Sequence, residues 1–456
     1  MAELCQAAEA ILAERGITAP LMIVRGDGSL VSAAFAKNRP IETILSGPAA
    51  SLIGAGYLTG QADIVVSDIG GTTTDVGVLR RGHPTVSIEG ATVGGHQTMV
   101  EAVQMFTFGL GGDSEVRLDP RGRTAALTIG PRRVTPLAAL AAEEPELVQR
   151  TLANRGFPYR DHDTMFATQT GRIGPASQRE QKILDAMGAG WVPVDSVAKS
   201  NLETSALTTL VGRGLVRLAG FTPTDASHVL GLHTQWDPTA SIQAAELIAA
   251  AADATGQPVM ASGKDFAQWV FDTLVRRSAE AVLTATLAID GMPPSTVDSA
   301  LVQRALDGHR GATTIKISTA NAVVGLGASA ATYYPAVAAL LGSERAIPNH
   351  AEVANAIGAA IGRVRITRQT TVSQPSKGRF RVHHPDADGD LGNLEPAIEL
   401  AIELLSNDVR LQADDAGAVQ LLLDTDVERN VATVGGRELF VEATVTVVGS
   451  GEPRTS

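Results

Sequence analysis

Residues 67–79, SDIGGTTTDVGVL, place carboxylate, hydroxyl and glycine residues between two short apolar runs. A glycine-rich turn can point several backbone N–H groups at one place, because glycine accepts positive φ angles and lets the backbone approach a ligand closely. Such a turn suits phosphate oxygens, and an aspartate beside it suits a Mg²⁺ ion that bridges phosphates. The segment therefore predicts a hairpin for phosphates and magnesium, with an ordinary turn rich in Gly and Thr as the alternative. The residues that would carry this chemistry are Asp68, Gly70, Gly71, Thr72, Thr73 and Asp75.

Other elements must hold this hairpin in place. Residues 63–66 (DIVV) and 76–79 (VGVL) read as the two strands that flank it. Residues 46–56 and 354–362 predict helices rich in small residues, which can lie close to another backbone. Residues 322–342 predict a strand, a glycine turn and a helix in succession.

This order of motifs resembles the superfamily of ATPases that contains acetate and sugar kinases, heat-shock chaperones and actin. In those proteins a connecting helix precedes the phosphate hairpin, and a glycine turn against the adenosine and a second connecting helix follow it. More narrowly, the chain resembles the hydantoinase A/5-oxoprolinase family over residues 20 to about 365. The motifs that carry this resemblance are GDGSLVS, RPIETILSGPAAS, DIGGTTTDVGVLRRGHP, VGGH, GLGGDS, IGPRRV and FTPTDASHVLG.

The resemblance implies roles for individual residues. Asp68 and Asp75 would be catalytic, and Asp68 would also bind the metal. ATP and Mg²⁺ are the implied cofactors. The residues that would bind ATP are Gly70, Gly71, Thr72 and Thr73 at the phosphates, Gly111, Gly112, Asp113 and Ser114 in the cleft near them, and Gly325, Gly327 and Ser329 along the nucleoside.

The activity that the resemblance implies is ATP-dependent hydrolysis of a cyclic amide, either a hydantoin or a lactam. Phosphoryl transfer to the amide oxygen would create a good leaving group, and water would then open the ring. Two alternatives are a nucleotide-binding regulatory or scaffold protein without turnover and a subunit of an ATP-dependent ketone carboxylase. The motifs do not identify the substrate or the oligomeric state.

One departure from the family affects the expected activity. Family members carry an earlier lobe with its own Asp-x-Gly-Gly-Thr hairpin, whereas this sequence holds the pattern once, at residues 68–72. An ATP site between two lobes would then have one wall, so we expect weak or absent ATPase activity from the chain alone. The expected partners are a chain that supplies the first lobe, a hydantoinase B-like subunit, or both, besides the small cyclic amide.

The expected fold is α/β, with a ribonuclease-H-like lobe of the actin-like ATPase type, a helical insertion and a small C-terminal α+β module. Residues 1–60 would form the tail of the first lobe and the connecting helix. Residues 61–365 would form the second lobe, with the insertion at about 136–310. Residues 366–450 would form the C-terminal module, and residues 451–456 a disordered tail.

The composition narrows the classes of protein. The formal net charge of −12 argues against binding to nucleic acid or an anionic membrane, because both need a basic surface. The single cysteine, Cys5, allows no disulfide framework and fits a reducing cytoplasm. The first 16 residues lack the basic and apolar regions of a signal peptide, and no stretch is long and apolar enough to span a membrane. We therefore expect a soluble cytoplasmic protein.

Several other residues are weaker candidates for chemistry. His96 follows a Gly-Gly pair, and we expect a surface or hydrogen-bonded side chain there rather than a catalytic one. The acidic and histidine clusters at 161–163 and 383–384 lack the spacing of a metal site. Arg132 and Arg133 could contact an anion, but an exposed charged turn is the favoured interpretation. We expect Cys5 to be a packed thiol, and the PTDAS and DPTAS stretches to be helix N-caps without chemistry.

Overall fold

The chain forms a mixed α/β structure with two compact units. The computed structural model describes residues 1–454 except 88–89, 91, 94–95, 99, 121–124, 157–158, 161 and 435–436. Unit 1 comprises residues 1–57, 82–104 and 354–456, and unit 2 comprises residues 58–81 and 105–353. Among the described residues, no helix combines the length and the apolar character that crossing a lipid bilayer requires.

The main sheet of unit 2 is built on β3 (Ile64–Ile69), whose residues are almost all buried, as its apolar sequence predicts. Its strand order is β10-β4-β3-β17-β18. The pairs β10–β4 and β4–β3 are antiparallel, while β3–β17 and β17–β18 are parallel. The bounds of the other strands are β4 Thr74–Arg80, β10 Phe106–Phe108, β17 Ala322–Leu326 and β18 Arg345–Ala346.

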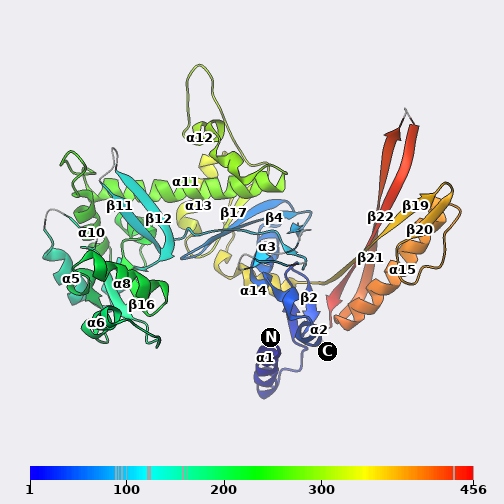
Figure 1. Ribbon diagram of the computed structural model, residues 1–456, viewed down its shortest axis with the longest axis horizontal. Helices are drawn as coiled ribbons and strands as arrows, with labels where there is room; N and C mark the ends of the chain where they lie inside the picture. The colour runs from blue at the N-terminus through cyan, green and yellow to red at the C-terminus, as the bar shows by residue number, and fades with distance from the viewer. Residues whose placement is uncertain are drawn as a thin grey trace. The chain divides into compact units, whose positions relative to one another are not determined.

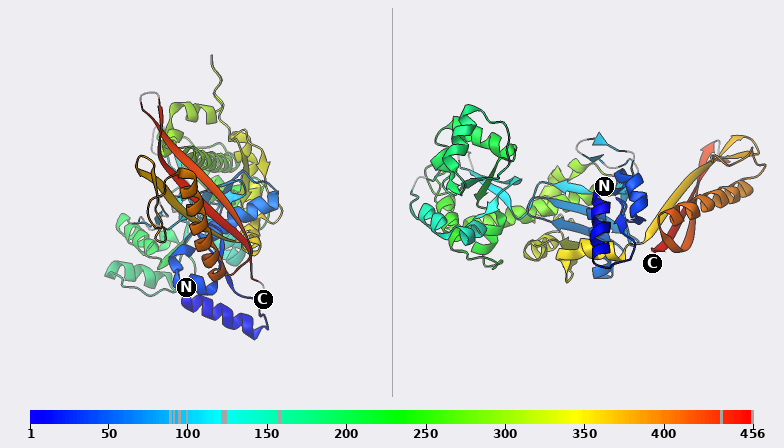
Figure 2. Two further views of the ribbon diagram at one scale, coloured as in Figure 1. Left: turned by 90° about the vertical axis from the view of Figure 1, so that its right-hand side faces the viewer. Right: turned by 90° about the horizontal axis from the view of Figure 1, so that it is seen from below.

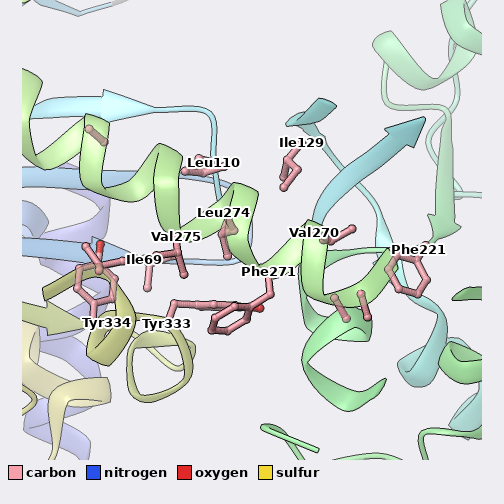
Figure 3. Close-up of a cluster of buried hydrophobic side chains, with 14 of the residues drawn as sticks. Ile69, Leu110, Ile129, Phe221, Val270, Phe271, Leu274, Val275, Tyr333 and Tyr334 are labelled. Carbon is pink, nitrogen blue, oxygen red and sulfur yellow. The ribbon is translucent and has the colours of Figure 1, made fainter. Parts of the chain in front are cut away.

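Two helices pack against this sheet. The long helix α11 (Gly263–Ile289) lies across β4, and α13 (Ala330–Leu340) follows β17 and packs on it (Figure 1). Figure 3 shows part of the core between them, where Ile69 and Leu110 lie beside α11 side chains such as Leu274 and Val275. This core fixes the end of β3, where the predicted phosphate hairpin begins.

The segment expected as a helical insertion contains a second small sheet besides its helices. The sheet order is β13-β16-β14-β15. The strands are β13 Thr135–Pro136, β14 Phe166–Gln169, β15 Val192–Pro193 and β16 Val216–Gly220, preceded by the hairpin of β11 Ser114–Asp119 and β12 Ala126–Arg133. Besides α11, the helices of this segment are α4 Leu137–Glu143, α5 Pro145–Ala153, α6 Gln178–Met187, α7 Val194–Val197, α8 Asn201–Gly212, α9 Pro223–Val229, α10 Thr239–Ala249 and α12 Ala300–Leu306, with a short 3₁₀ helix at Pro294–Asp298. A further 3₁₀ helix, Ala351–Val353, lies after β18 and outside this segment.

Unit 1 is built around an antiparallel sheet of order β20-β19-β22-β21. Helix α15 (Leu394–Asp415) lies along this sheet and buries one apolar face on it (Figure 2). The strands are β19 Val364–Ser376, β20 Arg379–Val382, β21 Ala418–Val434 and β22 Arg437–Pro453. The other elements are α1 Ala2–Glu14, β1 Met22–Val24, β2 Leu30–Ser32, α2 Ala33–Asn38, a 3₁₀ helix Pro40–Thr43, α3 Ser46–Thr59, α14 Ala354–Ile361 and the short strands β5 His83–Pro84, β6 Val86–Ser87, β7 Thr92–Val93, β8 His96–Gln97 and β9 Ala102–Val103.

The two helices rich in small residues, α3 and α14, meet at two glycines. A Cβ atom on Gly54 would overlap the carbonyl oxygen of Ala354, and one on Gly358 would overlap that of Ala50. Because both glycines lack a side chain, the two backbones can touch directly. The predicted close approach of these helices is therefore confirmed, with each as the other's neighbour.

The C-terminal residues differ from the expectation of a disordered tail, which was wrong for residues 451–453. Gly451 pairs with Val364 of β19, and Glu452 pairs with Val419 of β21. A chain end stays ordered when a sheet holds it, and the polar composition of the tail gave no sign of this pairing. Residues 455–456 lie outside the described part of the chain.

The N-terminal segment and the C-terminal module, which we expected as separate parts of the chain, belong to the same compact unit. Leu30 and Phe35 from the N-terminal segment share one core with Val364, Ile398 and Val445 from the C-terminal segment. The sequence gives no direct sign of this grouping, because the two segments are more than 300 residues apart along the 456-residue chain. Residues 366–450 therefore pack as part of unit 1.

Candidate functional site

The turn between β3 and β4 is a tight hairpin. Asp68 pairs with Asp75 and Ile69 pairs with Thr74 across the two strands. The N–H of Gly70 donates to the carbonyl oxygen of Thr73 at 2.9 Å and closes the turn. The paired aspartates lie directly opposite each other, so their side chains project from the same face of the sheet. The structure thus brings Asp68 and Asp75 together beside the turn.

The turn presents three consecutive backbone amides. None of the described residues accepts a hydrogen bond from the N–H of Gly71, Thr72 or Thr73. These three residues are only partly buried. Backbone N–H groups are strong donors that are normally paired, so a row of three without a protein acceptor is suited to an anion or to water.

The glycine-rich loop that follows β10 is bonded to this turn. Gly112 donates its N–H to the carbonyl oxygen of Gly70 at 3.1 Å, and Asp113 donates to that of Gly71 at 2.7 Å. The hydroxyl of Thr74 donates to the carbonyl oxygen of Leu110 at 2.7 Å, and Ser114 Oγ accepts from the N–H of Gly111 at 2.9 Å. The predicted grouping of this loop with the hairpin is therefore seen in the structure.

This contact requires glycine at position 111. A Cβ atom there would lie 2.6 Å from the carbonyl oxygen of Gly70 and 2.6 Å from the nitrogen of Thr72. Real Cβ atoms do not approach backbone atoms this closely. A side chain at position 111 would therefore push the loop away from the hairpin.

The turn after β17 completes the arrangement. Leu326 lies opposite Asp68 in the parallel pair of β17 and β3. Gly327 has a φ of 91°, and a Cβ atom on it would be 3.0 Å from Asp68 Oδ1. A Cβ atom on Gly112 would be 2.9 Å from the hydroxyl of Ser329. The hairpin, the loop and this turn therefore contact one another in pairs.

Gly325 packs against a side chain in the core, unlike Gly112 and Gly327. A Cβ atom there would lie 2.7 Å from the ring of Tyr334 on α13. Gly325 is buried, so the structure shows a packing role that the motif alone did not reveal. Tyr334 also shares a short hydrogen bond with the hydroxyl of Ser67, and burial raises its pKa well above the usual range.

Two charged residues beside the hairpin have defined partners. Asp75 Oδ1 accepts a hydrogen bond from the hydroxyl of Thr107 at 2.5 Å. Asp113 Oδ2 accepts from Arg133 at 3.1 Å. Burial raises the pKa of Asp113, while its hydrogen bonds with Arg133 and Thr224 oppose this rise. Arg133, expected as an exposed turn residue, is thus tied to the loop although its side chain remains largely exposed.

The start of α9 is a part of the site that the sequence analysis missed. Thr224 donates both its N–H and its hydroxyl to the carbonyl oxygen of Gly112, each at 2.9 Å. The helix start expected at the PTDAS stretch is confirmed, and its cap is a capping box between Asp225 and Thr222, the residue just before the stretch. The position of Thr224 within a capping pattern explains why chemistry was not assigned to it.

The remaining candidates are the clusters at 161–163 and 383–384, Cys5 and His96. Among the described residues, no three His, Cys, Asp or Glu side chains gather to hold an ion. His383 contacts Ser373, and His384 contacts Asp408. Cys5 is a buried free thiol, as expected. Gly94, Gly95 and Asp161 lie outside the described residues, and for His96 only the backbone is described, in β8.

Comparison with known proteins places this architecture in a family. A family model described as hydantoinase/oxoprolinase matches residues 1–368, which include the hairpin, the loop and the turn after β17. Since this match extends over most of the chain, the chain belongs to the hydantoinase/oxoprolinase family.

Individual relatives are longer than this chain. The acetone carboxylase beta subunit of Xanthobacter autotrophicus (strain ATCC BAA-1158 / Py2) is 33% identical over 121 residues, which are 26% of this chain and 16% of that protein. A nucleotide-free structure of acetone carboxylase, which carries out ATP-dependent acetone carboxylation, aligns with a TM-score of 0.51 and 17% identity over 99% of this chain and 55% of its own. The ATP-dependent caprolactamase from Pseudomonas jessenii aligns with a TM-score of 0.53 and 15% identity over 100% of this chain and 56% of its own. These two structures share the fold, and this chain spans little more than half of their length.

Proposed function

We propose that unit 2 binds Mg·ATP, with the terminal phosphates at the hairpin between β3 and β4. The observation that carries this proposal is the row of three backbone amides at Gly71, Thr72 and Thr73. None of the described residues accepts a hydrogen bond from them. Asp68 lies beside them, next to Gly327. Phosphate oxygens would accept from the amides, and Asp68 would hold Mg²⁺ directly or through water.

We assign the sheet of unit 2 to a ribonuclease-H-like lobe of the actin-like ATPases. Numbered along the chain, the five strands β3, β4, β10, β17 and β18 lie in the order 3-2-1-4-5, with the second strand antiparallel to its neighbours. The support for this assignment is a sheet with one antiparallel strand, a hairpin between its first two strands and a glycine turn after its fourth strand. The glycine turn after the fourth strand would lie along the nucleoside, with Gly327 and Ser329 facing it and Gly325 supporting the turn from within the core.

The reaction we favour is ATP-dependent activation of a cyclic amide, a hydantoin or a lactam, for ring opening. Magnesium would neutralise charge on the transferring phosphoryl group. The chain's own contribution would be positional: the amides orient the phosphates, and Asp75 is held in one orientation by Thr107. The match to the acetone carboxylase beta subunit favours one other candidate, activation of a ketone for carboxylation.

We further propose that the second wall of the ATP site is supplied from outside this sequence. A preceding segment of a longer protein, a first-lobe chain or a hydantoinase B-like subunit could contribute it. The support is that the sequence contains the Asp-x-Gly-Gly-Thr pattern once, at residues 68–72. Without the second wall, the chain would bind nucleotide with little turnover. Rapid multiple-turnover ATP hydrolysis by the purified chain would contradict this proposal.

The substitution Asp68→Ala tests the nucleotide site. We expect the affinity for Mg·ATP, measured by calorimetry, to fall at least about tenfold, equivalent to roughly 1.4 kcal/mol. Asp185→Ala is the matched control, because Asp185 lies exposed on α6 and its side chain bonds, among the described residues, to Gln181 of the same helix. Equal Mg·ATP affinity in the wild type and in Asp68→Ala would remove the phosphate assignment.

A further inference from the structure

A cavity of about 650 Å³ lies in unit 2, beyond the glycine-rich loop. Its wall includes residues of β11, α8 and the end of β16, elements that Figure 1 labels within unit 2. The cavity begins directly after the loop, since its first lining residue, Glu115, follows Ser114 in the sequence. The N–H of Val116 donates to the carbonyl oxygen of Phe221 at 3.2 Å and so joins two parts of the cavity wall. This volume is within the range of small-molecule sites in proteins.

The charged groups of the cavity are arranged around one buried carboxylate. The side chain of Glu115 is 6% exposed. Its Oε2 lies 3.7 Å from Nε of Arg117, and its Oε1 lies 3.7 Å from a terminal nitrogen of Arg132. At 3.7 Å these are ion pairs without hydrogen bonds. Glu115 therefore lies between two guanidinium groups without using up their N–H donors. The other titratable groups that line the cavity are Asp119, Tyr159 and His162.

Within the described part of the chain, Arg117 and Arg132 leave most of their N–H donors unused. Each guanidinium has five N–H donors in a planar fork. Among the described residues, neither side chain makes a hydrogen bond, and the side chains are 57% and 34% exposed for Arg117 and Arg132. Planar guanidinium groups match the geometry of a carboxylate, which accepts two parallel hydrogen bonds.

The rest of the wall fits an organic body rather than a bare ion. Phe221 and Ile248 contribute apolar surface, and Thr164 and Thr208 contribute hydroxyl groups. An inorganic anion would leave the apolar part of a 650 Å³ space without contacts. A molecule with an apolar body and one carboxylate would use both features.

We propose that this cavity binds a small organic carboxylate, with the carboxylate group on Arg132 and Arg117 and the apolar body against Phe221. Glu115 is a positioning residue that holds the two guanidinium groups at one end of the cavity. Ligand binding here requires neither ATP nor turnover, so it stands independently of the nucleotide site.

A matched pair of probes tests the proposal. We would titrate the full chain with 3-phenylpropionate and with its neutral isostere 3-phenylpropionamide, using ligand-observed NMR. We expect the carboxylate to bind at least tenfold more tightly than the amide. Arg132→Gln and Arg117→Gln should each reduce the affinity for the carboxylate toward that of the amide. Arg150→Gln, at an exposed position on α5, should leave both affinities unchanged.

The melting temperature of each variant establishes that the variant is folded. Because Arg132→Gln and Arg117→Gln are independent variants, the test does not depend on one of them alone. Asp68→Ala should keep probe binding even if it abolishes Mg·ATP binding, so failure of the carboxylate site is distinguishable from failure of the nucleotide site. No binding of 3-phenylpropionate at millimolar concentration, equal affinity for acid and amide, or unchanged binding in both arginine variants would overturn the proposal. Displacement of the probe by inorganic phosphate at equal concentration would also overturn the proposal, because the site would then bind negative charge alone and not the apolar body of an organic acid.

Discussion

At the scale of single residues, the proposed phosphate site is made chiefly of main-chain atoms. The backbone amides of Gly71, Thr72 and Thr73 can bind an anion without any side chain. Glycine is required at position 111 because the neighbouring backbone leaves no room for a side chain there. Such a site is therefore more sensitive to an added methyl group than to the loss of a functional group. Asp68 is the exception, because its carboxylate is the proposed contact to magnesium.

We predict that Gly111→Ala lowers both Mg·ATP affinity and stability. The added Cβ atom would meet backbone atoms of Gly70 and Thr72 at 2.6 Å, which forces the loop away from the hairpin. Overpacking of this kind costs about 1–3 kcal/mol, and we expect at least a tenfold loss of affinity. Calorimetric titration and thermal unfolding measure the two effects. Gly190→Ala is the control, since a Cβ atom there meets nothing within 4 Å; equal behaviour of the two variants would show that the loop can move without consequence.

A second prediction concerns His228, which is buried between His233 and Trp236. Neither ring nitrogen has a hydrogen-bond partner among the described residues. Burial lowers the pKa of His228 and the ring of His233 lowers it further, while the backbone of His233 partly opposes this decrease. Because the folded-state pKa lies below the ordinary value of 6.5, this group costs nothing above pH 6.5 and destabilises the fold as pH falls through and below that value.

Accordingly, unit 2 should melt at a lower temperature at pH 5.5 than at pH 7.5, and His228→Phe should make this difference smaller. Phenylalanine keeps a ring at the site and cannot take up a proton. His350→Asn is the control, because His350 is exposed and its positive φ suits asparagine. If His228→Phe and wild type show the same change in melting temperature between the two pH values, His228 does not titrate as proposed.

At the scale of elements, one pair of helices is joined by direct contact between backbones. Helices α3 and α14 meet through Gly54 and Gly358. Asp225 acts differently: it is fully buried and accepts hydrogen bonds from the N–H groups of Leu137 and Ala138 at the start of α4 and from Ser241 on α10. One carboxylate therefore joins α4, α9 and α10, and it supports the end of α9 that carries Thr224.

We expect Gly54→Ala to destabilise unit 1. The new Cβ atom would overlap the carbonyl oxygen of Ala354 and force α3 and α14 apart, at a cost of about 1–3 kcal/mol. Gly47→Ala lies on the same helix with nothing within 4 Å and should be neutral or slightly stabilising, because alanine favours helix. Denaturant unfolding of both variants measures the difference. Equal midpoints would indicate that the helices do not rely on this contact.

At the scale of the whole molecule, the residues that we propose bind the nucleotide and the residues of the C-terminal sheet belong to different units. Every residue proposed to contact ATP lies within residues 58–81 or 105–353. The sheet of β19 to β22 belongs to unit 1, with a core of its own. A ligand that binds only one unit stabilises that unit selectively.

Hydrogen exchange should therefore slow in a limited set of amides when Mg·ATP is added. We expect protection at residues 68–75 and 108–114, because the amides of Gly71, Thr72 and Thr73 gain phosphate acceptors. Residues of β21 should be unchanged. Exchange measured by mass spectrometry, with Asp68→Ala as the control, gives the comparison. Protection of β21 without protection of the hairpin would place the nucleotide elsewhere.

The sequence by itself determined the parts of the site that depend on local chemistry. The pattern Asp-x-Gly-Gly-Thr between apolar runs predicted the hairpin of β3 and β4, and the strand, glycine turn and helix at 322–342 were found as β17, Gly327 and α13. These features follow from hydrophobic pattern and backbone freedom, which are properties of neighbouring residues. The family resemblance also follows from the sequence and is confirmed by the match over residues 1–368.

Only the tertiary structure decided which distant segments meet. Thr224 at Gly112, Tyr334 behind Gly325, and the shared core of residues 22–36 with the C-terminal sheet depend on long-range packing, which no local pattern in one sequence encodes. The last strand shows the same limit: residues 451–453 look like a free tail in composition, yet they are ordered because β19 and β21 offer them backbone partners.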